Sequence, residues 1–397
     1  MRIGIDASSW SNKRGFGRFT RELLTALARN AGDDEIVLLV DRQTADASQF
    51  PVGWKLIVAD TTVAPTQAAA ADGRRSLRDM WAMRRAAARE PVDVFYFPAV
   101  YTYFPLAGDV PCIVTFHDVI AETLPRLVFH NRLSRFFWNA KCRLALRRST
   151  LVATVSQASK RGLMAHFRLP EQRLRVLPEA SSATFAPVDE RDPAHDAVLQ
   201  KHGLRRGERF FVYFGGISPH KNLATLIDAF AAMRVHGGAR NVKLVLVGDY
   251  AGDVFRTCHD ELCQQARTRG VEDGIRFPGW VSDADLCHLL AAAEAFVFPS
   301  FLEGFGLPAV EAMACGAAVI ASDRGSLPEV VGDAGLLVNP DRPLELANAM
   351  SRVLGDTGLR ANLRSRGLAR ASQFSWDHSA RALRNVLHEL GDRPVAG

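Results

Sequence analysis

Two glutamates spaced eight residues apart are the residues of this chain most suggestive of chemistry. Glu303 stands in the glycine-rich loop of PSFLEGFGLPAVEAMACG (299–316), and Glu311 follows in a predicted helix whose first turn suits Pro308. A glutamate in a first turn could serve only the helix dipole. That explanation does not account for Gly304, Phe305 and Gly306, whose amides would be left pointing into a ligand cleft. Since a carboxylate can accept hydrogen bonds from two sugar hydroxyls, the segment predicts a sugar-binding loop.

A lysine in a second glycine turn could supply positive charge. Gly215 and Gly216 follow the apolar run FFVYF, and His220, Lys221 and Asn222 lead into a predicted helix. Glycines and a lysine at such a turn suit a phosphate cradle in which the ammonium acts as a point charge. A solvated lysine at a helix start explains the pattern equally well.

The front half of the chain contains two weaker candidates. Gly15, Gly17 and Arg18 lie between a strand and a helix, where backbone amides can approach an anion, although a simple tight turn is as good an explanation. The turn lacks the third glycine of a dinucleotide fingerprint. His117 closes an apolar run at its carboxyl end, and a lone histidine is more often structural than functional.

Apolar runs that alternate with helical patterns must position these residues. Near-continuous runs of this kind indicate parallel sheets covered on both faces, so the fold class is α/β with two doubly wound, Rossmann-like domains. Ligands bind at the carboxyl ends of strands in such sheets, here in a cleft between the domains. The predicted strands lie at 2–6, 36–41, 55–59, 93–98, 112–118 and 151–156 in the first half and at 210–216, 242–248, 275–281, 295–300, 317–322 and 335–340 in the second.

The predicted domain boundaries follow from where the alternation lapses. Residues 178–207 are rich in proline, serine and charge, contain a short polar helical pattern, and are predicted to be an inter-domain linker. The first domain is therefore placed at 1–185 and the second at 186–375. A last helix over 376–397 is expected to pack back on the first domain.

Composition excludes several classes of protein. The chain has 397 residues, of which 48% are hydrophobic and 23% charged, so disorder, collagen and coiled coil are excluded. No apolar run approaches the roughly 18–20 residues of a membrane span, and Asp6 interrupts the apolar start that a signal peptide needs. A cytoplasmic protein is predicted.

No metal site is predicted. The six cysteines form no Cys-x-x-Cys pair, and Cys258-His259, Cys263 and Cys287-His288 are better explained as free thiols and structural histidines than as zinc ligands. Asp283-Ala284-Asp285 resembles a metal-binding Asp-x-Asp. Because it follows Ser282 at a helix start, capping is the stronger explanation.

The net charge of +6 is unevenly distributed. Residues 1–185 contain 26 basic and 17 acidic side chains, and the remainder contains 23 and 26. The predicted helix 132–148 mixes basic residues with Phe136, Phe137 and Trp138. This composition suits an anionic membrane surface. A core helix with a basic outer face is the competing explanation, and nothing resembles a nucleic-acid module.

Three segments make the chain similar to the retaining nucleotide-sugar glycosyltransferases of family 4, which have the GT-B fold. They are GIDASSWSNKRGFGRFTRELL, VATVSQASKRGLMAHFRLPEQRLRVLPEA and FPSFLEGFGLPAVEAMACGAAVIAS, and the last matches the Glu-x7-Glu motif. The resemblance implies that Glu303 contacts the donor sugar, that Glu311 contacts ribose, and that the amides of 305–307 approach sugar or phosphate. It also implies that Lys221 neutralises the diphosphate and that His117 lies near the transferred sugar.

Departures from the family pattern concern the diphosphate site. Relatives often have arginine where this chain has Gly216, or immediately before the lysine, where it has His220. Diphosphate stabilisation would then depend on Lys221, helix dipoles and either His220 or Arg18. Pro178-Glu179-Ala180 replaces a common Asn-Gly. Val281 is the candidate neighbour of the nucleotide base.

The resemblance implies a retaining transferase that moves a hexose, with mannose favoured, from a nucleotide-diphosphate sugar to an acceptor hydroxyl. The acceptor would be a sugar or a lipid-linked glycan in polysaccharide or glycolipid assembly, with peripheral contact at an anionic membrane. No cofactor or metal is expected, since positive groups and amides can stabilise the leaving diphosphate. A sugar-nucleotide epimerase of the same fold and a non-catalytic sugar-nucleotide-binding subunit are the alternatives.

Overall fold

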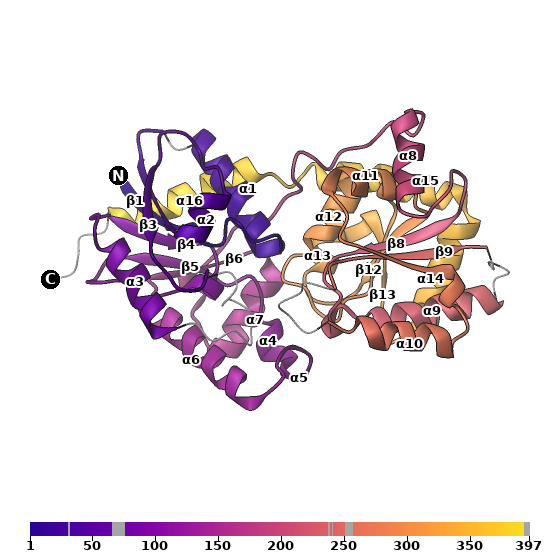
Figure 1. Cartoon of the computed structure of the whole chain (residues 1–397), viewed down its shortest axis with the longest axis horizontal. Coiled ribbons are helices and arrows are strands. Elements are labelled where there is room, and N and C mark those ends of the chain that lie inside the picture. Colours follow the sequence, from indigo (N-terminus) through magenta and orange to yellow (C-terminus); the bar gives the residue numbers. More distant parts are fainter. Residues whose placement is uncertain (31, 66–75, 237–238, 240, 251–256, 393–397) are drawn as a thin grey trace. The chain divides into compact units, whose positions relative to one another are not determined.

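The computed structural model describes residues 1–397 except 31, 66–75, 237–238, 240, 251–256 and 393–397. The chain divides into two compact units. Unit 1 is formed by Met1–Glu179 and Ser375–Gly397, and unit 2 by Ala180–Phe374. Each unit is a parallel sheet flanked by helices, which confirms the predicted α/β fold class (Figure 1).

Unit 1 has a sheet of strand order β3-β2-β1-β4-β5-β6-β7. The order reverses between β1 and β4, and ligands of open parallel sheets bind at the carboxyl ends of strands beside such a switch point. The strands are β1 (Arg2–Asp6), β2 (Glu35–Asp41), β3 (Lys55–Ala59), β4 (Val94–Phe97), β5 (Cys112–Thr115), β6 (Leu151–Thr154) and β7 (Leu174–Val176). The helices are α1 (Gly15–Asn30), α2 (Arg42–Ala47), α3 (Leu77–Ala87), α4 (Ile120–Thr123), α5 (Pro125–Val128), α6 (Arg132–Arg148), α7 (Gln157–Phe167) and α16 (Trp376–Gly391).

Unit 2 repeats this arrangement with one strand fewer, in the order β10-β9-β8-β11-β12-β13. Its switch point lies between β8 and β11. The strands are β8 (Phe210–Phe214), β9 (Lys243–Val247), β10 (Ile275–Gly279), β11 (Ala295–Phe298), β12 (Val319–Ser322) and β13 (Gly335–Val338). The helices are α8 (Pro193–Lys201), α9 (Leu223–His236), α10 (His259–Thr268), α11 (Asp283–Ala292), α12 (Leu307–Ala314), α13 (Leu327–Val331), α14 (Pro343–Gly355) and α15 (Thr357–Ala371).

The last helix, α16, belongs to unit 1, where Figure 1 draws it in yellow beside the indigo α1. The ring centroids of Trp376 and Phe19 are 5.8 Å apart. Asp34 accepts hydrogen bonds from Nε of Arg384 at 2.7 Å and from Nε2 of His388 at 2.9 Å. Apolar packing and a buried carboxylate therefore fix the end of the chain to its beginning.

The boundary between the units lies at Glu179–Ala180, and not at the predicted 185–186, because the following segment packs on unit 2. The rings of Phe185 and Phe214 are stacked with centroids 6.5 Å apart. The thiol of Cys287 donates to the carbonyl oxygen of Thr184 at 3.3 Å. These contacts attach residues 180–185 to β8 and α11.

Most of the segment 178–207, predicted to be a linker, belongs to unit 2, and α8 is the short polar helix predicted within it. Asp285 of α11 accepts from Nζ of Lys201 at 2.7 Å and from Nε2 of His202 at 2.9 Å. The Nδ1 atoms of His195 and His288 lie 3.1 Å apart. Polar contacts with α11 thus make the segment part of unit 2.

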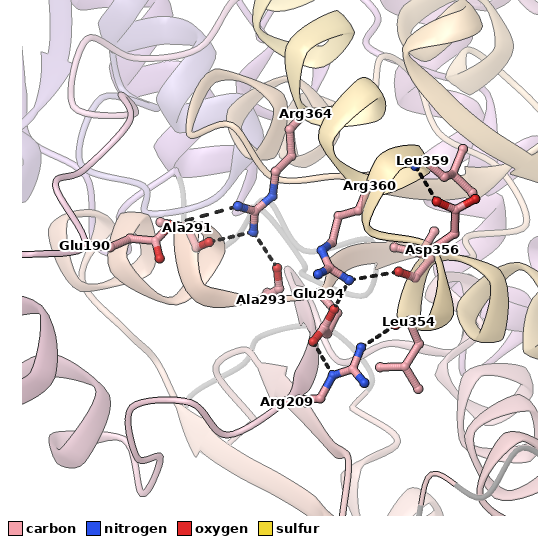
Figure 2. Close-up of polar contacts among 11 residues, drawn as sticks. Glu190, Arg209, Ala291, Ala293, Glu294, Leu354, Asp356, Leu359, Arg360 and Arg364 are labelled. Atoms are coloured by element: carbon pink, nitrogen blue, oxygen red, sulfur yellow. Dashed lines mark hydrogen bonds and ion pairs between the residues drawn. The ribbon is translucent and has the colours of Figure 1, made fainter.

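A network of arginines closes the amino edge of the unit 2 sheet (Figure 2). Glu294, which immediately precedes β11, accepts from Nε of Arg209 at 2.6 Å and from Arg360 of α15. Arg209 also donates to the carbonyl oxygen of Leu354 at the end of α14. Arg364 donates to the carbonyl oxygens of Ala291 and Ala293 at 2.8 and 3.0 Å. The network links α14 and α15 to the strands, away from the carboxyl edge.

Candidate functional site

The strongest sequence candidates meet at the switch point of unit 2. The turn with Gly215 and Gly216 follows β8, and the loop with Glu303 follows β11, which is the neighbour of β8 in the sheet. The amide of Phe301 donates to the carbonyl oxygen of His220 at 3.0 Å, so the two loops are directly hydrogen-bonded. The parallel sheet thus brings together residues that are about eighty positions apart in sequence.

Lys221 and Glu303 form the ion pair at the centre of this site. Nζ of Lys221 lies 2.7 Å from Oε1 of Glu303, and the two side chains are 15% and 8% exposed. The ammonium also lies 5.4 Å from the ring centroid of Phe298, within range of a cation–π interaction. The sequence did not predict this contact, because each residue was assigned a different part of a ligand.

The loop that carries Glu303 is fixed from the side of α13. Oγ of Ser326 donates to the carbonyl oxygens of Glu303 and Phe305, at 3.1 and 2.7 Å. Gly306 has a φ of 96°, in the left-handed region that favours glycine. In the described part of the chain, no hydrogen-bond partner is found for the amides of Phe305, Gly306 and Leu307. The loop therefore presents three donors at the start of α12, and sequence reasoning missed Ser326, which supports it.

The prediction that Glu311 lies in the first turn of its helix is wrong. The helix α12 begins at Leu307 with proline in its second position, and no acidic residue falls in its first turn. Glu311 lies beyond that turn and is 2% exposed. A favourable interaction with the helix dipole therefore does not explain a buried glutamate at this position. A specific interaction of its carboxylate is the better explanation.

Tyr213 fixes the glycine turn beside Lys221. Its hydroxyl donates to the carbonyl oxygen of Gly216 at 2.7 Å. Burial, and then the charge of Glu303, raise the pKa of Tyr213, so its phenol remains a donor. Gly215 has a φ of 142°, and a Cβ there would lie 2.9 Å from this hydroxyl. In the part of the chain that the structure describes, a Cβ at Gly216 would contact only Oγ of Ser218, at 3.7 Å, so these residues do not require glycine there sterically.

Asn222 links the loops that follow β8, β11 and β13 at the carboxyl edge of the sheet. It adopts a φ of 58° and is 4% exposed. Its side-chain amide donates to the carbonyl oxygens of Pro299 and Pro340, at 3.1 and 2.8 Å. Asparagine is one of the residues that tolerate the left-handed region, which was the available signal for this role. His220, the proposed substitute for the missing arginine, has its Nδ1 3.2 Å from Oγ of Ser218.

The remaining unit 2 candidates lie apart from this pair. Val281 follows β10, the strand at the far edge of the order β10-β9-β8, and is 5% exposed. Ser282 caps α11, because its side chain accepts from the amide of Asp285, which confirms the capping explanation. No group of three or more metal-ligating side chains occurs among the described residues.

In unit 1, His117 lies just beyond β5 and its ring contacts Glu179. Nδ1 is 3.4 Å from Oε1 of Glu179, and Nε2 is 3.0 Å from the carbonyl oxygen of Pro98, beyond β4. Since a neutral imidazole has one N–H, only the doubly protonated ring could donate to both oxygens. The edge of the ring packs on Phe19 of α1, with centroids 4.7 Å apart. Glu179, noted in the sequence only as a departure from the family, therefore positions His117.

The glycine turn of unit 1 forms the start of a helix. The helix α1 begins at Gly15, so Gly15, Gly17 and Arg18 belong to its start and do not lie in a turn before it, as the sequence predicted. A Cβ at Gly17 would lie 2.1 Å from the carbonyl oxygen of Asn12, so packing by itself requires this glycine. Among the described residues, no atom would lie within 4 Å of a Cβ at Gly15. These contacts explain Gly17 without a ligand.

The helix α6 matches its predicted range, and its aromatic residues divide between two faces. Trp138 is 5% exposed and its Nε1 donates to Oε1 of Glu122 at 2.6 Å. Phe136 and Phe137 are 64% and 52% exposed. No helix in the described part of the chain is long and apolar enough to cross a membrane.

Comparison with known proteins supports the assignment of this fold. The family model for Glycosyltransferase Family 4 matches residues 13–180, and that for Glycosyl transferases group 1 matches residues 195–370. The chain is 36% identical over 268 residues to O-antigen chain mannosyltransferase B of Escherichia coli, covering 67% of each protein. It is 25% identical over 403 residues to the serotype-specific mannosyltransferase WbdA of the same organism, covering 96% of this chain but 47% of that protein.

A solved structure of Anabaena HepE, in complex with UDP and glucose, has the same fold. It superposes with a TM-score of 0.72 at 22% identity, covering 98% of this chain and 100% of that one. Two doubly wound units of this kind define the GT-B class of glycosyltransferases. The chain belongs to glycosyltransferase family 4. It spans two thirds of the first of these relatives and about half of the second.

Proposed function

We propose that the protein is a retaining hexosyltransferase that moves mannose from a nucleotide-diphosphate sugar to an acceptor hydroxyl. The observation that carries the proposal is the Lys221–Glu303 pair, 2.7 Å apart, in the loops at the unit 2 switch point. The similarity to an O-antigen chain mannosyltransferase supports mannose as the sugar and a cell-surface polysaccharide or glycolipid as the product.

Catalysis in this proposal depends on stabilising charge on the departing diphosphate. The bond from the sugar carbon to the diphosphate oxygen breaks, and the acceptor oxygen bonds to the same face of that carbon. The acceptor proton passes to the leaving phosphate, so neither Glu303 nor His117 acts as a covalent nucleophile. Lys221 and the amides of residues 305–307 are the preorganised groups that would meet the developing charge.

The ion pair suggests how the donor would enter. Donor hydroxyls would replace Lys221 as the partner of Glu303, and the released ammonium would turn to the diphosphate. Glu311 would accept from the ribose hydroxyls. We infer that no metal or cofactor is needed, so a chelator should leave the activity unchanged.

Incubation of the purified protein with labelled nucleotide sugars tests the activity. GDP-mannose, UDP-glucose and UDP-galactose should be compared for transfer or slow hydrolysis. A thermal-shift screen of the nucleotide diphosphates identifies the base, because a ligand at about 100 times its dissociation constant stabilises by roughly 2.7 kcal/mol. Binding without transfer or hydrolysis would indicate a non-catalytic subunit. Exchange of sugar configuration without transfer would indicate an epimerase.

We further propose that the protein works in the cytoplasm, at the inner face of an anionic membrane, on a lipid-linked glycan bound by unit 1. The exposed Phe136 and Phe137 on the basic helix α6 support this idea. Sedimentation with neutral and anionic vesicles tests it, and Phe136→Ser/Phe137→Ser should reduce recovery with anionic vesicles. Equal recovery with both vesicle types at low salt would reject membrane contact.

A further inference from the structure

A depression lined with arginines lies along α6 and α7 of unit 1, and none of the candidate site residues lines it. Its volume is about 550 Å³. Its charged or titratable lining residues come from α4, α6, α7 and the segment that follows α7. They are Glu122, Arg135, Arg143, Arg147, His166, Arg168 and Arg173.

Helical spacing concentrates three of these arginines on one face of α6. Arg135, Asn139, Arg143 and Arg147 recur every four residues, so their side chains lie above one another beside the depression. Within the described residues, no side-chain hydrogen bond or ion pair is found for Arg135, Arg143, Arg147 or Arg168. All four of these arginines line the same depression, so their positive charges are concentrated there.

Arg168, which lines the depression after the end of α7, has an energetically unfavourable backbone conformation. Arg168 ends α7 with a φ of 54°, in the left-handed region where glycine is favoured. Arg173 serves the structure, since it donates to the carbonyl oxygens of Leu146 and Ser149 at 2.8 and 2.6 Å. Arg168 is therefore placed by a left-handed turn, and Arg173 is held by hydrogen bonds at the end of α6.

The acidic member of the lining does not cancel this charge. Burial raises the pKa of Glu122 to about 7, so the carboxyl is partly protonated at neutral pH. The positive field also acts on the histidine at the end of α7. Burial, and then the charges of Arg135 and Arg143, lower the pKa of His166.

We propose that this depression binds a phosphate-bearing anion. Guanidinium groups match phosphate oxygens in paired, planar hydrogen bonds, which a solvated lysine surface does not provide. The volume accommodates more than a phosphate ion, so a sugar phosphate or a lipid head group fits. The site lies in unit 1 and does not depend on the transfer reaction assigned to unit 2.

His166 supplies a local readout. Sulfate is a suitable probe, because its charge does not change over the range in which histidine titrates. An NMR titration, with the signal assigned by its loss in His166→Asn, should show that sulfate raises the pKa of His166. Arg135→Ala/Arg143→Ala should abolish this response, and Arg132→Ala/Arg148→Ala, which removes two exposed charges from the same helix outside the depression, should retain it. A His166 pKa that sulfate does not move, or an equal response in both double variants, overturns the proposal.

Two further arms identify the source of the phosphate. One measures binding of glucose 6-phosphate, and the other measures sedimentation with phosphatidylcholine vesicles with and without phosphatidic acid. Selective loss of about tenfold in affinity for phosphatidic acid vesicles, in Arg135→Ala/Arg143→Ala only, supports a lipid ligand. The same loss for glucose 6-phosphate, with vesicle binding unchanged, supports a soluble one. If both affinities are equal in the two double variants, the depression is not a phosphate site.

Discussion

One paired carboxylate lies immediately before strand β11 and another in the loop after it, and the surroundings of the two pairs differ. At the amino end, Glu294 is bound by Arg209 and Arg360, which link strands to α14 and α15. At the carboxyl end, Glu303 has Lys221 at 2.7 Å and lies in a glycine loop beside three unpartnered amides of the described chain. The same chemistry thus serves structure at one edge of the sheet and, we propose, ligand exchange at the other.

The difference shows why ion pairing by itself does not identify a functional site. Glu294 and Glu303 are 9% and 8% exposed, so burial does not separate them. Two other properties distinguish the two glutamates. One is the position relative to the switch point of the sheet, and the other is how freely the paired cation can move to another partner. Arg209 and Arg360 have further backbone acceptors, whereas a lysine carries a mobile point charge on a flexible stem.

The largest effect is expected from Lys221→Ala. Loss of the main diphosphate cation should lower kcat by about 10²–10³-fold. Because the variant leaves Glu303 buried without its partner, thermal unfolding should be measured alongside turnover. The double variant Lys221→Ala/Glu303→Gln is the control for stability, since it leaves no unpaired charge at this position. Turnover within about threefold of the parent, at saturating donor, would reject the assignment of Lys221.

The opposite result is expected from Glu294→Ala. Removing the acceptor of two arginines should destabilise the protein by about 2–4 kcal/mol and lower Tm by about 5–10 °C. At a temperature where the variant is folded, kcat should match that of the parent. A lowered kcat in fully folded Glu294→Ala would contradict the assignment of a purely structural role to Glu294.

The two glutamates of the Glu-x7-Glu motif should separate in binding and turnover. Glu311→Ala should weaken nucleotide diphosphate binding by about 10–100-fold, because we assign this carboxylate to ribose. Glu303→Ala should mainly lower turnover, because we assign it to the sugar. Calorimetry with the nucleotide diphosphate decides between them. If Glu303→Ala loses this affinity and Glu311→Ala keeps it, the roles are reversed.

An added cation at the carboxyl edge tests whether this edge, unlike the amino edge, binds an anion. A Cβ at Gly216 meets only Oγ of Ser218, at 3.7 Å, so an arginine can be introduced where relatives carry one. Gly216→Arg should raise nucleotide diphosphate affinity by about tenfold, and Gly216→Ala, which adds the Cβ without charge, should not. Equal affinity in the two variants would show that the turn does not face the diphosphate.

Glu122 of unit 1 extends the comparison to a buried carboxyl that has a tryptophan donor at 2.6 Å instead of an ion pair. Burial raises its pKa to about 7, above the value in an unfolded chain. The folded state therefore binds the proton more tightly, and this stabilisation is lost as pH rises through 7. Glu122→Gln should be more stable than the parent at pH above 7 by about 1 kcal/mol and equal to it well below 5. A stability difference between the two proteins that does not change with pH would contradict the raised pKa.

The fold class and the segments that carry the site could be inferred from the amino-acid sequence. Apolar runs bounded by glycine turns define buried parallel strands, because both faces of such strands must be covered. The spacing of Glu303 and Glu311 and the turn before Lys221 were also readable, since loops after buried strands fall at one edge of the sheet. The start of α12 was not, because Leu307 and Pro308 are both compatible with a first turn.

Which charged side chains contact one another could not be inferred without the folded structure. Lys221 and Glu303, or His117 and Glu179, are far apart in the chain, and strand order places them in contact. The segment after Glu179 was read as a linker because its composition is polar, whereas Asp285 and Cys287 of α11 bind it to unit 2. In the sequence, the arginines of 132–148 indicated only a basic helix. The left-handed turn at Arg168 and the four-residue spacing on α6 make them the lining of one depression, because side-chain direction is fixed by the backbone that carries it.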